Sequence, residues 1–472
     1  MDIFSLSIAA TLSVLLQICI TVHILLYKED VKSSIGWIGL VWLSPLFGAL
    51  IYAILGINRI KRKALALKNP KSNIKQITGK TIEELEQQIP LNFRQLLKLG
   101  YKIHPQLFVP ANNIVPLING DEAYPQMADA IKKAKKQVLI ESYIFNNDTA
   151  GQTILDACAQ AVKNGIQVRI IVDGVGLNYS RPDIKKAAEK IKELQMRIFL
   201  PSKKPAAMPF VNLRNHRKIM IIDGQTAFFG GMNIAQENLL KTNPATPVKD
   251  TTFKIEGPVI DQLARIFLED WIFTGGQNFK PEEFKTDKKE PCAEGFCRAI
   301  PDGPDSDYGK VKSIFFAAIN SATKNIKITT PYFLPDDNIL TALEFAAMRG
   351  IDTEIILPQK SNIFGMDYAM RANFARLIKS GVKIYLQEPP FDHSKLLCID
   401  GIWSVIGSAN WDERSLKLNF ESLLEIMDLK TTKQIEKIIN AKKALSTKQQ
   451  MPAYPFYKKI LFNAFKLLTP YY

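Results

Sequence analysis

Cysteine is scarce in this chain of 472 residues, and its placement excludes two common uses. The five cysteines are odd in number, and only Cys292 and Cys297 lie near each other, whereas Cys19, Cys158 and Cys398 are scattered. Because no second cysteine pair or nearby histidine accompanies the close pair, we do not expect a zinc site. Free or buried thiols in a reducing compartment are predicted instead.

Negative charge is also in short supply. The chain has 61 lysines and arginines against 46 acidic residues, which gives a net charge of +15. This excess favours a polyanionic partner, either nucleic acid or a membrane with acidic headgroups, and composition does not choose between them. The length indicates two globular units or one duplicated unit.

Charged side chains are absent from two stretches near the N-terminus, residues 3–27 and 35–57. Each is long enough to cross a hydrocarbon core of roughly 30 Å at about 1.5 Å per residue. A cleaved signal peptide fits poorly, because no basic segment precedes the first run and a second run follows at once. We predict a two-helix transmembrane hairpin, with Pro45 tolerated inside the second helix.

The flanking charges orient this hairpin. The connecting loop balances basic and acidic residues, whereas the second run is followed by Arg59, Lys61, Arg62 and Lys63. Basic residues concentrate on the cytoplasmic side of membrane helices. The sequence therefore predicts a multi-pass protein of the cell (inner or cytoplasmic) membrane, with its catalytic part on the cytoplasmic side.

Histidine is rare as well, yet two of the four histidines occupy matching places in a repeat. Both copies follow the pattern H-x-K-x4-D-x6-G-[GS]-x-N, and corresponding residues are 177 positions apart. The matched residues are His216, Lys218, Asp223 and Asn233 in the first copy and His393, Lys395, Asp400 and Asn410 in the second. Two copies that share the downstream glycine and asparagine are very hard to obtain by chance.

Strand and helix patterns precede each copy in the same order. They cover residues 138–145, 153–162 and 168–172, and then 326–333, 338–348 and 353–357. The apolar runs 219–222 and 396–399 inside the motifs predict buried strands, with each histidine and its lysine on one face of the chain leading in. We predict an α/β fold of two duplicated α/β/α units, related by a pseudo-two-fold axis that brings both motifs to one cleft.

The expected organisation has five segments. They are the transmembrane hairpin at 1–58, a basic linker with a short helix at 59–110, a first half at 111–290, a second half at 291–430 and a helical tail at 431–472. Apolar residues recur at helical spacing over 454–468, beside three lysines. A helix packed on the protein and a helix lying in the membrane interface both fit this pattern.

Paired histidines and lysines suit the chemistry of phosphodiesters. One neutral imidazole can attack phosphorus, and a protonated imidazole across the site can give its proton to the leaving alkoxide. Lysines stabilise the charge on the non-bridging oxygens and the asparagines donate to the same atoms, so that neither a metal nor another cofactor is needed. Asp223 and Asp400 are counted with the catalytic set as members of the motif, although their position favours holding loops or backbone amides.

These motifs resemble those of the phospholipase D superfamily and, within it, the bacterial cardiolipin synthases. The resemblance covers nearly the whole chain and includes residues 119–123, 141–145, 330–336 and 407–410. It implies transfer of a phosphatidyl group from one phosphatidylglycerol to another, which gives cardiolipin and glycerol. It also implies that His216 is the nucleophile and His393 the general acid and base, although the pattern itself is symmetric, and that Lys218, Lys395, Asn233 and Asn410 bind phosphate.

The superfamily also places an acidic residue beside each histidine, and the positions that match are Asp250 and Glu421. Such an acceptor fixes the tautomer and orientation of the imidazole. The family usually has Trp-Arg-Asp-x-His at the first of these sites, where this chain has Val-Lys-Asp-Thr-Thr at 248–252. This departure bears on the choice of acceptor.

Other functions stay open at this point. A membrane-bound phospholipase D could use water, phosphatidylethanolamine or a small alcohol as acceptor. A nuclease and a non-catalytic membrane scaffold are further alternatives. The hairpin favours anionic phospholipid and the membrane as partners, and no nucleic acid is expected, because a nuclease has little need of two membrane helices.

Overall fold

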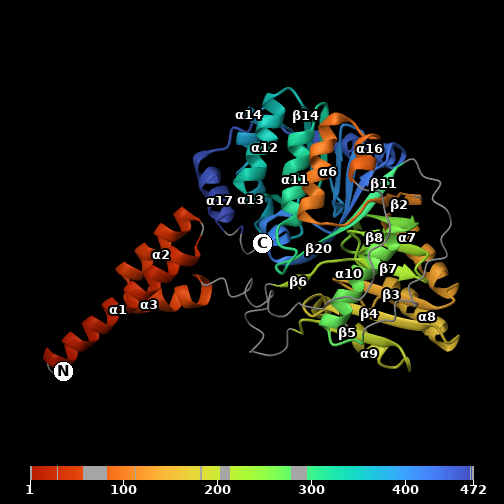
Figure 1. Cartoon of the computed structure of the whole chain (residues 1–472), viewed down its shortest axis with the longest axis horizontal. Coiled ribbons are helices and arrows are strands. Elements are labelled where there is room, and N and C mark those ends of the chain that lie inside the picture. Colours follow the sequence, from red (N-terminus) through yellow and green to blue (C-terminus); the bar gives the residue numbers. More distant parts are fainter. Residues whose placement is uncertain are drawn as a thin grey trace. The chain divides into compact units, whose positions relative to one another are not determined.

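The computed structural model describes residues 3–28, 30–56, 82–111, 113–180, 183–201, 213–277, 295–467 and 469 (Figure 1). The chain divides into two compact units, Met1–Ala66 and Leu67–Tyr472, and each is described by itself. The predicted basic segment that begins at Arg59 and the predicted thiol of Cys292 lie outside the described residues. The other cysteines form no disulfide within the described ranges, and only Cys19 among them is exposed.

The N-terminal unit begins with a long apolar helix. Helix α1 (Ile3–Tyr27) contains the window Ala10–Tyr27, whose mean hydropathy of 1.9 and length are sufficient to cross a membrane. The backbone amide of Ser33 donates to Asp30, which thereby caps α2 (Val31–Leu43). Nδ1 of His23 in α1 lies 2.9 Å from the hydroxyl oxygen of Tyr52, so that a polar pair links the first helix to the second apolar run.

The second predicted span is not one helix. Helix α2 ends at Leu43, and α3 (Pro45–Ile51) and a π-helical turn, η1 (Tyr52–Gly56), follow a break at Ser44. A residue that precedes proline avoids the helical conformation, and Ser44 has φ −143° and ψ 80°. Proline is instead favoured in the first turn of a helix, where Pro45 lies. At 13 residues, α2 extends only about 20 Å, too short to cross a membrane alone.

The prediction that Pro45 is tolerated inside a continuous second helix is therefore wrong. Helix α3 packs closely against α2, because Gly48 has no side chain. A Cβ atom at Gly48 would lie 2.5 Å from the carbonyl oxygen of Leu40. The apolar run from 35 onward is thus a broken helix whose two parts contact each other.

The first half of the larger unit contains a seven-stranded mixed sheet. Its strands, in spatial order, are β2 (Asn113–Ile118), β10 (Thr251–Glu256), β8 (Thr226–Gly230), β7 (Ile219–Ile222), β3 (Gln137–Ser142), β4 (Gln167–Asp173) and β5 (Gln195–Phe199). Helices α7 (Asn119–Lys132) and α8 (Thr149–Lys163) cover one face and form an apolar core with alternate strand residues such as Val138 and Ile140. Helix α10 (Val259–Phe273) packs on the sheet at β7 and β10.

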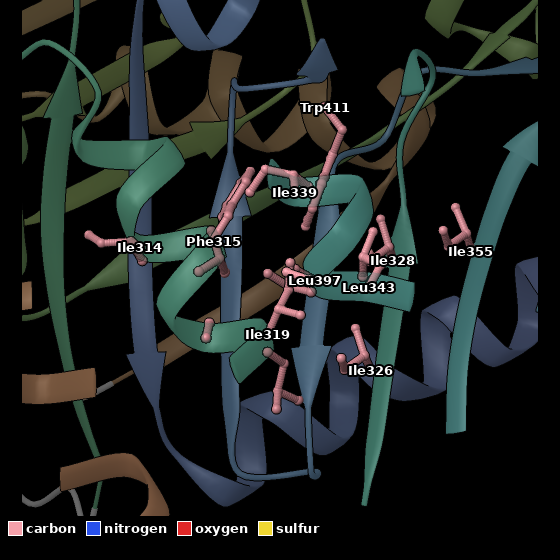
Figure 2. Close-up of a cluster of buried hydrophobic side chains, with 14 of the residues drawn as sticks. Ile314, Phe315, Ile319, Ile326, Ile328, Ile339, Leu343, Ile355, Leu397 and Trp411 are labelled. Carbon is pink, nitrogen blue, oxygen red and sulfur yellow. The ribbon is translucent and has the colours of Figure 1, made fainter. Parts of the chain in front are cut away.

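The second half repeats this order. Its strands β11 (Phe296–Asp302), β20 (Asn419–Met427), β18 (Trp403–Gly407), β17 (Leu396–Ile399), β12 (Asn325–Thr329), β14 (Asp352–Pro358) and β15 (Lys383–Gln387) correspond one by one to those of the first sheet. Helices α11 (Lys310–Ser321) and α12 (Asp337–Met348) match α7 and α8 in sequence order, and Figure 2 shows the core between these helices and the sheet. Helix α16 (Leu429–Ala444) matches α10. The predicted duplicated α/β fold is confirmed.

Two segments belong to this second half although the sequence suggested otherwise. Helix α6 (Leu91–Ile103) lies in the predicted linker, yet its apolar side chains, such as Phe93, enter the core of the second half, and β1 (Val109–Pro110) pairs with β11. Beyond residue 430, α16 packs on the second sheet, and β21 (Ser446–Lys448) extends it beside β15. The second half is therefore larger than predicted at both ends.

The tail ends in a helix that contacts the protein. Helix α17 (Phe456–Lys466) packs on α13 (Met366–Arg371), where Phe462 stacks on Tyr368 with ring centroids 5.6 Å apart. Phe465 lies at the same distance, 5.6 Å, from Phe364. Of the two arrangements that the sequence allowed, packing on the protein is present in the structure.

Candidate active site

Each half of the larger unit holds the histidine of the other half. The short strand β6 (Arg214–Asn215) runs parallel to β20 of the second half, and β16 (Phe391–Asp392) runs parallel to β9 (Val248–Lys249) of the first. The backbone amide of His216 donates to the carbonyl of Phe420 at 2.9 Å, and that of His393 donates to Lys249 at 2.7 Å. This exchange brings the two imidazole centroids to 6.4 Å.

The acidic partners are exchanged in the same way. Nδ1 of His216 lies 3.1 Å from the carboxylate of Glu421 and 3.1 Å from the carbonyl oxygen of Ser408. Nδ1 of His393 lies 2.9 Å from the carboxylate of Asp250. With acceptors at Nδ1, each neutral imidazole carries its proton there and keeps a lone pair on Nε2. The structure therefore brings both predicted acids to the histidines, each from the opposite half.

The acid beside His216 has more donors than the acid beside His393. Glu421 accepts from Ser408 Oγ at 2.5 Å, from Ser415 Oγ at 2.6 Å and from Asn419 Nδ2 at 3.2 Å. Burial opposes ionisation, but His216 and the other neighbours outweigh it and hold the pKa of Glu421 below its usual value. Glu421 therefore stays a fixed carboxylate, which orients the imidazole.

Burial makes both imidazoles weak bases. It lowers the pKa of His216 to about 4, an effect that Glu421 opposes and the two motif lysines reinforce. Burial likewise lowers the pKa of His393 to about 4, with Lys395 adding to the shift and Asp250 opposing it. Both rings are thus neutral near pH 7, the form that a nucleophile requires. An anion bound between them would favour protonation of one ring.

The motif lysines lie buried beside the histidines. Lys218 donates to the carbonyl of His216 at 2.5 Å, and Lys395 donates to that of His393 at 2.6 Å. Burial lowers the pKa of Lys218 to about 7 and that of Lys395 to about 8, although Glu421 and Asp250 oppose the shifts. An ammonium group in such a site gains from a nearby anion, so the pair is suited to bind one, and the role of both lysines as phosphate ligands stays a prediction.

A cleft of about 600 Å³ opens over the histidines. Asn233 and Asn410 both line it, and their role as ligands of the substrate stays a prediction. Tyr143 and Tyr332 line it as well, with their rings 5.1 and 6.3 Å from those of His216 and His393 respectively. The two tyrosines occupy matching strand ends, a repeat visible in the sequence whose role we did not predict.

The motif aspartates are not in the cleft. Asp223 accepts from the backbone amides of residues 135, 136 and 137 at 2.7 to 2.9 Å, and Asp400 accepts from those of residues 323, 324 and 325 at 2.8 to 2.9 Å. Both are in the left-handed region, with φ 55° and 54°. The two carboxylates fix the starts of β3 and β12. Counting them with the catalytic residues was therefore wrong, whereas the expectation that they hold backbone amides agrees with the structure.

A metal site was not predicted, and the described ranges contain no group of three His, Cys, Asp or Glu side chains arranged to hold an ion.

Arg214 and Arg414 also line the cleft. Sequence analysis missed both. Both arginines lie close to a motif residue in the sequence. The matching positions in the other copy hold different residue types, so the repeat did not mark either arginine as part of the site.

Comparison with known proteins identifies the family. The family described as "Cardiolipin synthase, PLD-like domain" matches residues 127–285 and 315–443. Cardiolipin synthase 1 of Bacillus cereus is 32% identical over 95% of this chain and 90% of its own length. The cardiolipin synthase of Geobacillus thermodenitrificans is 34% identical over 82% of this chain and 78% of its own.

A solved structure shares the fold. The crystal structure of phosphatidylserine synthase from Haemophilus influenzae has a TM-score of 0.61 to this chain at 16% identity, and it covers 80% of this chain and 99% of its own. The family model and the two relatives agree with the site, in which two matching motifs place each histidine beside an acid of the other half. The chain belongs to the cardiolipin synthase family of phospholipase D-like proteins.

Proposed function

We propose that the protein transfers a phosphatidyl group from one phosphatidylglycerol to the terminal hydroxyl of another, so that cardiolipin and glycerol are formed. The observation that carries this proposal is the facing pair of histidines, 6.4 Å apart, each held by an acid from the other half. Membership of the cardiolipin synthase family supports the choice of a lipid phosphodiester as substrate.

The reaction has two displacements. In the first, Nε2 of His216 attacks phosphorus, a P–N bond forms and the P–O bond to glycerol breaks, while His393 gives its proton to the leaving oxygen. In the second, His393 takes the proton of the incoming hydroxyl, the new P–O bond forms and the P–N bond breaks. Lys218 and Lys395 stabilise the negative charge on the non-bridging oxygens in both steps.

The surroundings of the rings support His216 as the nucleophile. Its Nδ1 proton has two acceptors, Glu421 and Ser408, which leave the lone pair of Nε2 available for attack. At His393 the ammonium of Lys395 lies 3.1 Å from Nδ1 and 3.0 Å from Nε2, so its positive charge contacts the ring as a whole. A positive charge against the ring weakens the imidazole as a nucleophile, so His393 suits proton transfer better than attack on phosphorus.

The membrane is the proposed location of this reaction. Helix α1 is long and apolar enough to anchor the chain, and the basic residues after position 58 favour a cytoplasmic catalytic part. Besides the side chains that contact α13, α17 has exposed apolar ones, among them Phe456 and Ile460, with Lys458 and Lys459 beside them. Phe364 is 83% exposed and follows Ile363, which lines the cleft.

This apolar and basic surface, formed by α17 and Phe364, suits contact with an anionic bilayer. Apolar side chains enter the boundary of the acyl chains, and lysines attract acidic headgroups at about 1 kcal/mol each. Because the surface continues to the cleft through Ile363, a lipid headgroup could reach the histidines while its acyl chains stay in the bilayer.

The test uses the purified full chain and labelled phosphatidylglycerol in vesicles with a metal chelator. Cardiolipin and glycerol are the expected products. Phosphatidic acid as the main product would show hydrolysis, and no turnover of any phosphodiester would refute an enzymatic role.

Trapping of the intermediate tests the two histidine roles. We expect His216→Ala to abolish an acid-labile phosphoenzyme and His393→Ala to let it accumulate. The opposite result would exchange the two assignments and leave the overall reaction unchanged.

A further inference from the structure

The cleft is symmetric in backbone but not in charge. Arg214 begins β6, and the matching position of β16 is Phe391. Arg414 follows the motif asparagine by four residues, and Glu237 is the matching residue of the first half. All four side chains line the cleft. The pseudo-two-fold axis relates the ends of the cleft, so one end carries the arginines and the other carries the phenylalanine and the glutamate.

The two arginines come from neighbouring elements: β6, which begins at Arg214, pairs with β20, and Arg414 lies in α15 (Glu413–Lys417), which leads into β20. Burial lowers the pKa of Arg214, and the positive charge of Arg414 lowers it further, against the opposing effect of Asp173. Both arginines also act on Tyr143: burial raises the pKa of this phenol, and the two positive charges oppose the rise. The hydroxyl of Tyr143 and both arginines therefore belong to the same end of the cleft.

The scaffold fixes Arg214 in this position. Its Nη1 atom lies 3.6 Å from Oδ1 of Asp173, which also accepts from the backbone amides of Val175 and Gly176 at 2.8 and 3.1 Å. The other oxygen of Asp173 accepts from the amide of Asn215 at 2.9 Å. The carboxylate thus ties the arginine strand to the end of β4, while its own charge is shared among three amides.

Asp173 beside Arg214 and the cleft residue Asp412, on which Arg414 acts, offset part of the positive charge at this end. Two cations in a partly desolvated cleft repel each other, and a bound anion lowers the remaining cost. The guanidinium group has a planar set of donors that matches the oxygens of a phosphate. The motif lysines are the proposed anion site between the histidines. The arginine end is therefore suited to a second phosphate at a short distance from the first.

We propose that Arg214 and Arg414 form a second phosphate site, which binds the phosphodiester of the acceptor lipid while the transferred phosphate is bound between the histidines. This inference rests on the proposed function. The acceptor phosphatidylglycerol has its own phosphate at the other end of the glycerol whose terminal hydroxyl attacks, and the product contains both phosphates. Water has no such group, so the arginine site favours transfer over hydrolysis by retaining the acceptor near phosphorus.

The test is Arg414→Gln, because Arg414 is only half-buried and its loss leaves the core intact. Arg349→Gln is the control, since Arg349 is exposed at the end of α12 and loses the same charge. Three products are measured from labelled phosphatidylglycerol in vesicles: cardiolipin, phosphatidic acid and the product of transfer to an added neutral alcohol such as ethanol.

Arg414→Gln should lower the ratio of cardiolipin to phosphatidic acid by about tenfold, which corresponds to about 1.4 kcal/mol. Transfer to ethanol should stay at the wild-type rate, the control should match wild type in every product, and Arg414→Lys should restore part of the ratio. An equal fall in transfer to ethanol would place the arginine on the transferred phosphate and overturn the proposal. An unchanged ratio would overturn it while the proposed function stands. A wild-type protein that makes no cardiolipin would overturn both.

Discussion

Arg217, the residue between the histidine and the lysine of the first motif, should be the largest single contributor to the joining of the two halves. Its side chain is fully buried. One guanidinium nitrogen pairs with Asp270 of α10, Nε donates to the carbonyl of Glu421 at 2.9 Å, and Nη2 donates to the carbonyl of Asp302 at 3.1 Å. One residue of the first half therefore holds β20 and β11 of the second.

The structure gives the expected cost of Arg217→Met. Removing one partner of a buried ion pair typically costs about 3–5 kcal/mol, because the other charge is left without a partner. Asp270 is itself fully buried and lies beside Glu141, whose pKa is already raised by burial and by the charge of Asp270. The two carbonyls lose their donors at about 1 kcal/mol each. A loss of about 5–7 kcal/mol is a large part of the roughly 5–15 kcal/mol that stabilises a typical domain.

Denaturant unfolding of the full chain in detergent micelles measures this loss. The double variant Arg217→Met with Asp270→Leu removes both members of the ion pair and should recover a large part of the stability, since the carboxylate of Asp270 is then no longer left without its cation. Arg349→Gln is the exposed control and should unfold like wild type. The reasoning is refuted if Arg217→Met unfolds within about 1 kcal/mol of wild type, or if the double variant is less stable than the single one.

Two further predictions concern pH and the membrane. The ammonium of Lys218 is present below its pKa of about 7 and is lost above it, so kcat/KM should fall as pH rises through neutrality. Lys218→Arg should shift that fall to about pH 8, where Lys395 loses its proton, and a wild-type profile that is flat to the same pH would contradict the prediction. Phe456→Glu with Ile460→Glu should weaken binding to anionic vesicles and lower activity on them, without lowering activity on a short-chain soluble substrate. Leu429→Glu, an exposed apolar change on α16, is the control, and vesicle binding equal to wild type would exclude α17 as the membrane contact.

The duplicated fold could be predicted because its signals are local. Apolar runs at 219–222 and 396–399 become the buried central strands β7 and β17, and the same order of strands and helices recurs before each. The histidine–lysine pairs follow from the same repeat. The acidic partners of the histidines could not be predicted in this way. Residues 250 and 421 belong to no repeated motif, so only the family resemblance pointed to them. The contact of each histidine with the opposite half depends on the pairing of short strands such as β6 with β20, which no periodic pattern in the sequence indicates.

The errors also have physical causes. The sequence of α6 shows an apolar face but does not show which core that face joins. Because α6 lies in the sequence between the apolar N-terminal runs and the first sheet, it was assigned to a linker. The break at Ser44 arises from a single proline, whose effect on a helix depends on whether neighbouring groups replace the lost backbone bond. Here the chain begins a new helix at Pro45 instead.

One motif position, glycine in the first copy and serine in the second, distinguishes two histidines that the repeat makes equivalent. Ser408 Oγ donates to Glu421, which fixes the acid beside His216. At the matching Gly231, an added Cβ atom would lie 3.2 Å from Cδ of Lys395 and 3.3 Å from a carboxylate oxygen of Asp250.

The absence of a side chain at Gly231 thus leaves room for Lys395, whose ammonium reaches the ring of His393 as well as its carbonyl. Lys218 donates to the carbonyl of His216. A serine at 231 would require Lys395 and Asp250 to shift by a few tenths of an ångström beside His393. The difference between one hydroxymethyl group and none therefore gives the acid beside His216 a further donor and leaves room for the ammonium beside His393, an asymmetry that agrees with the proposed roles of the two rings.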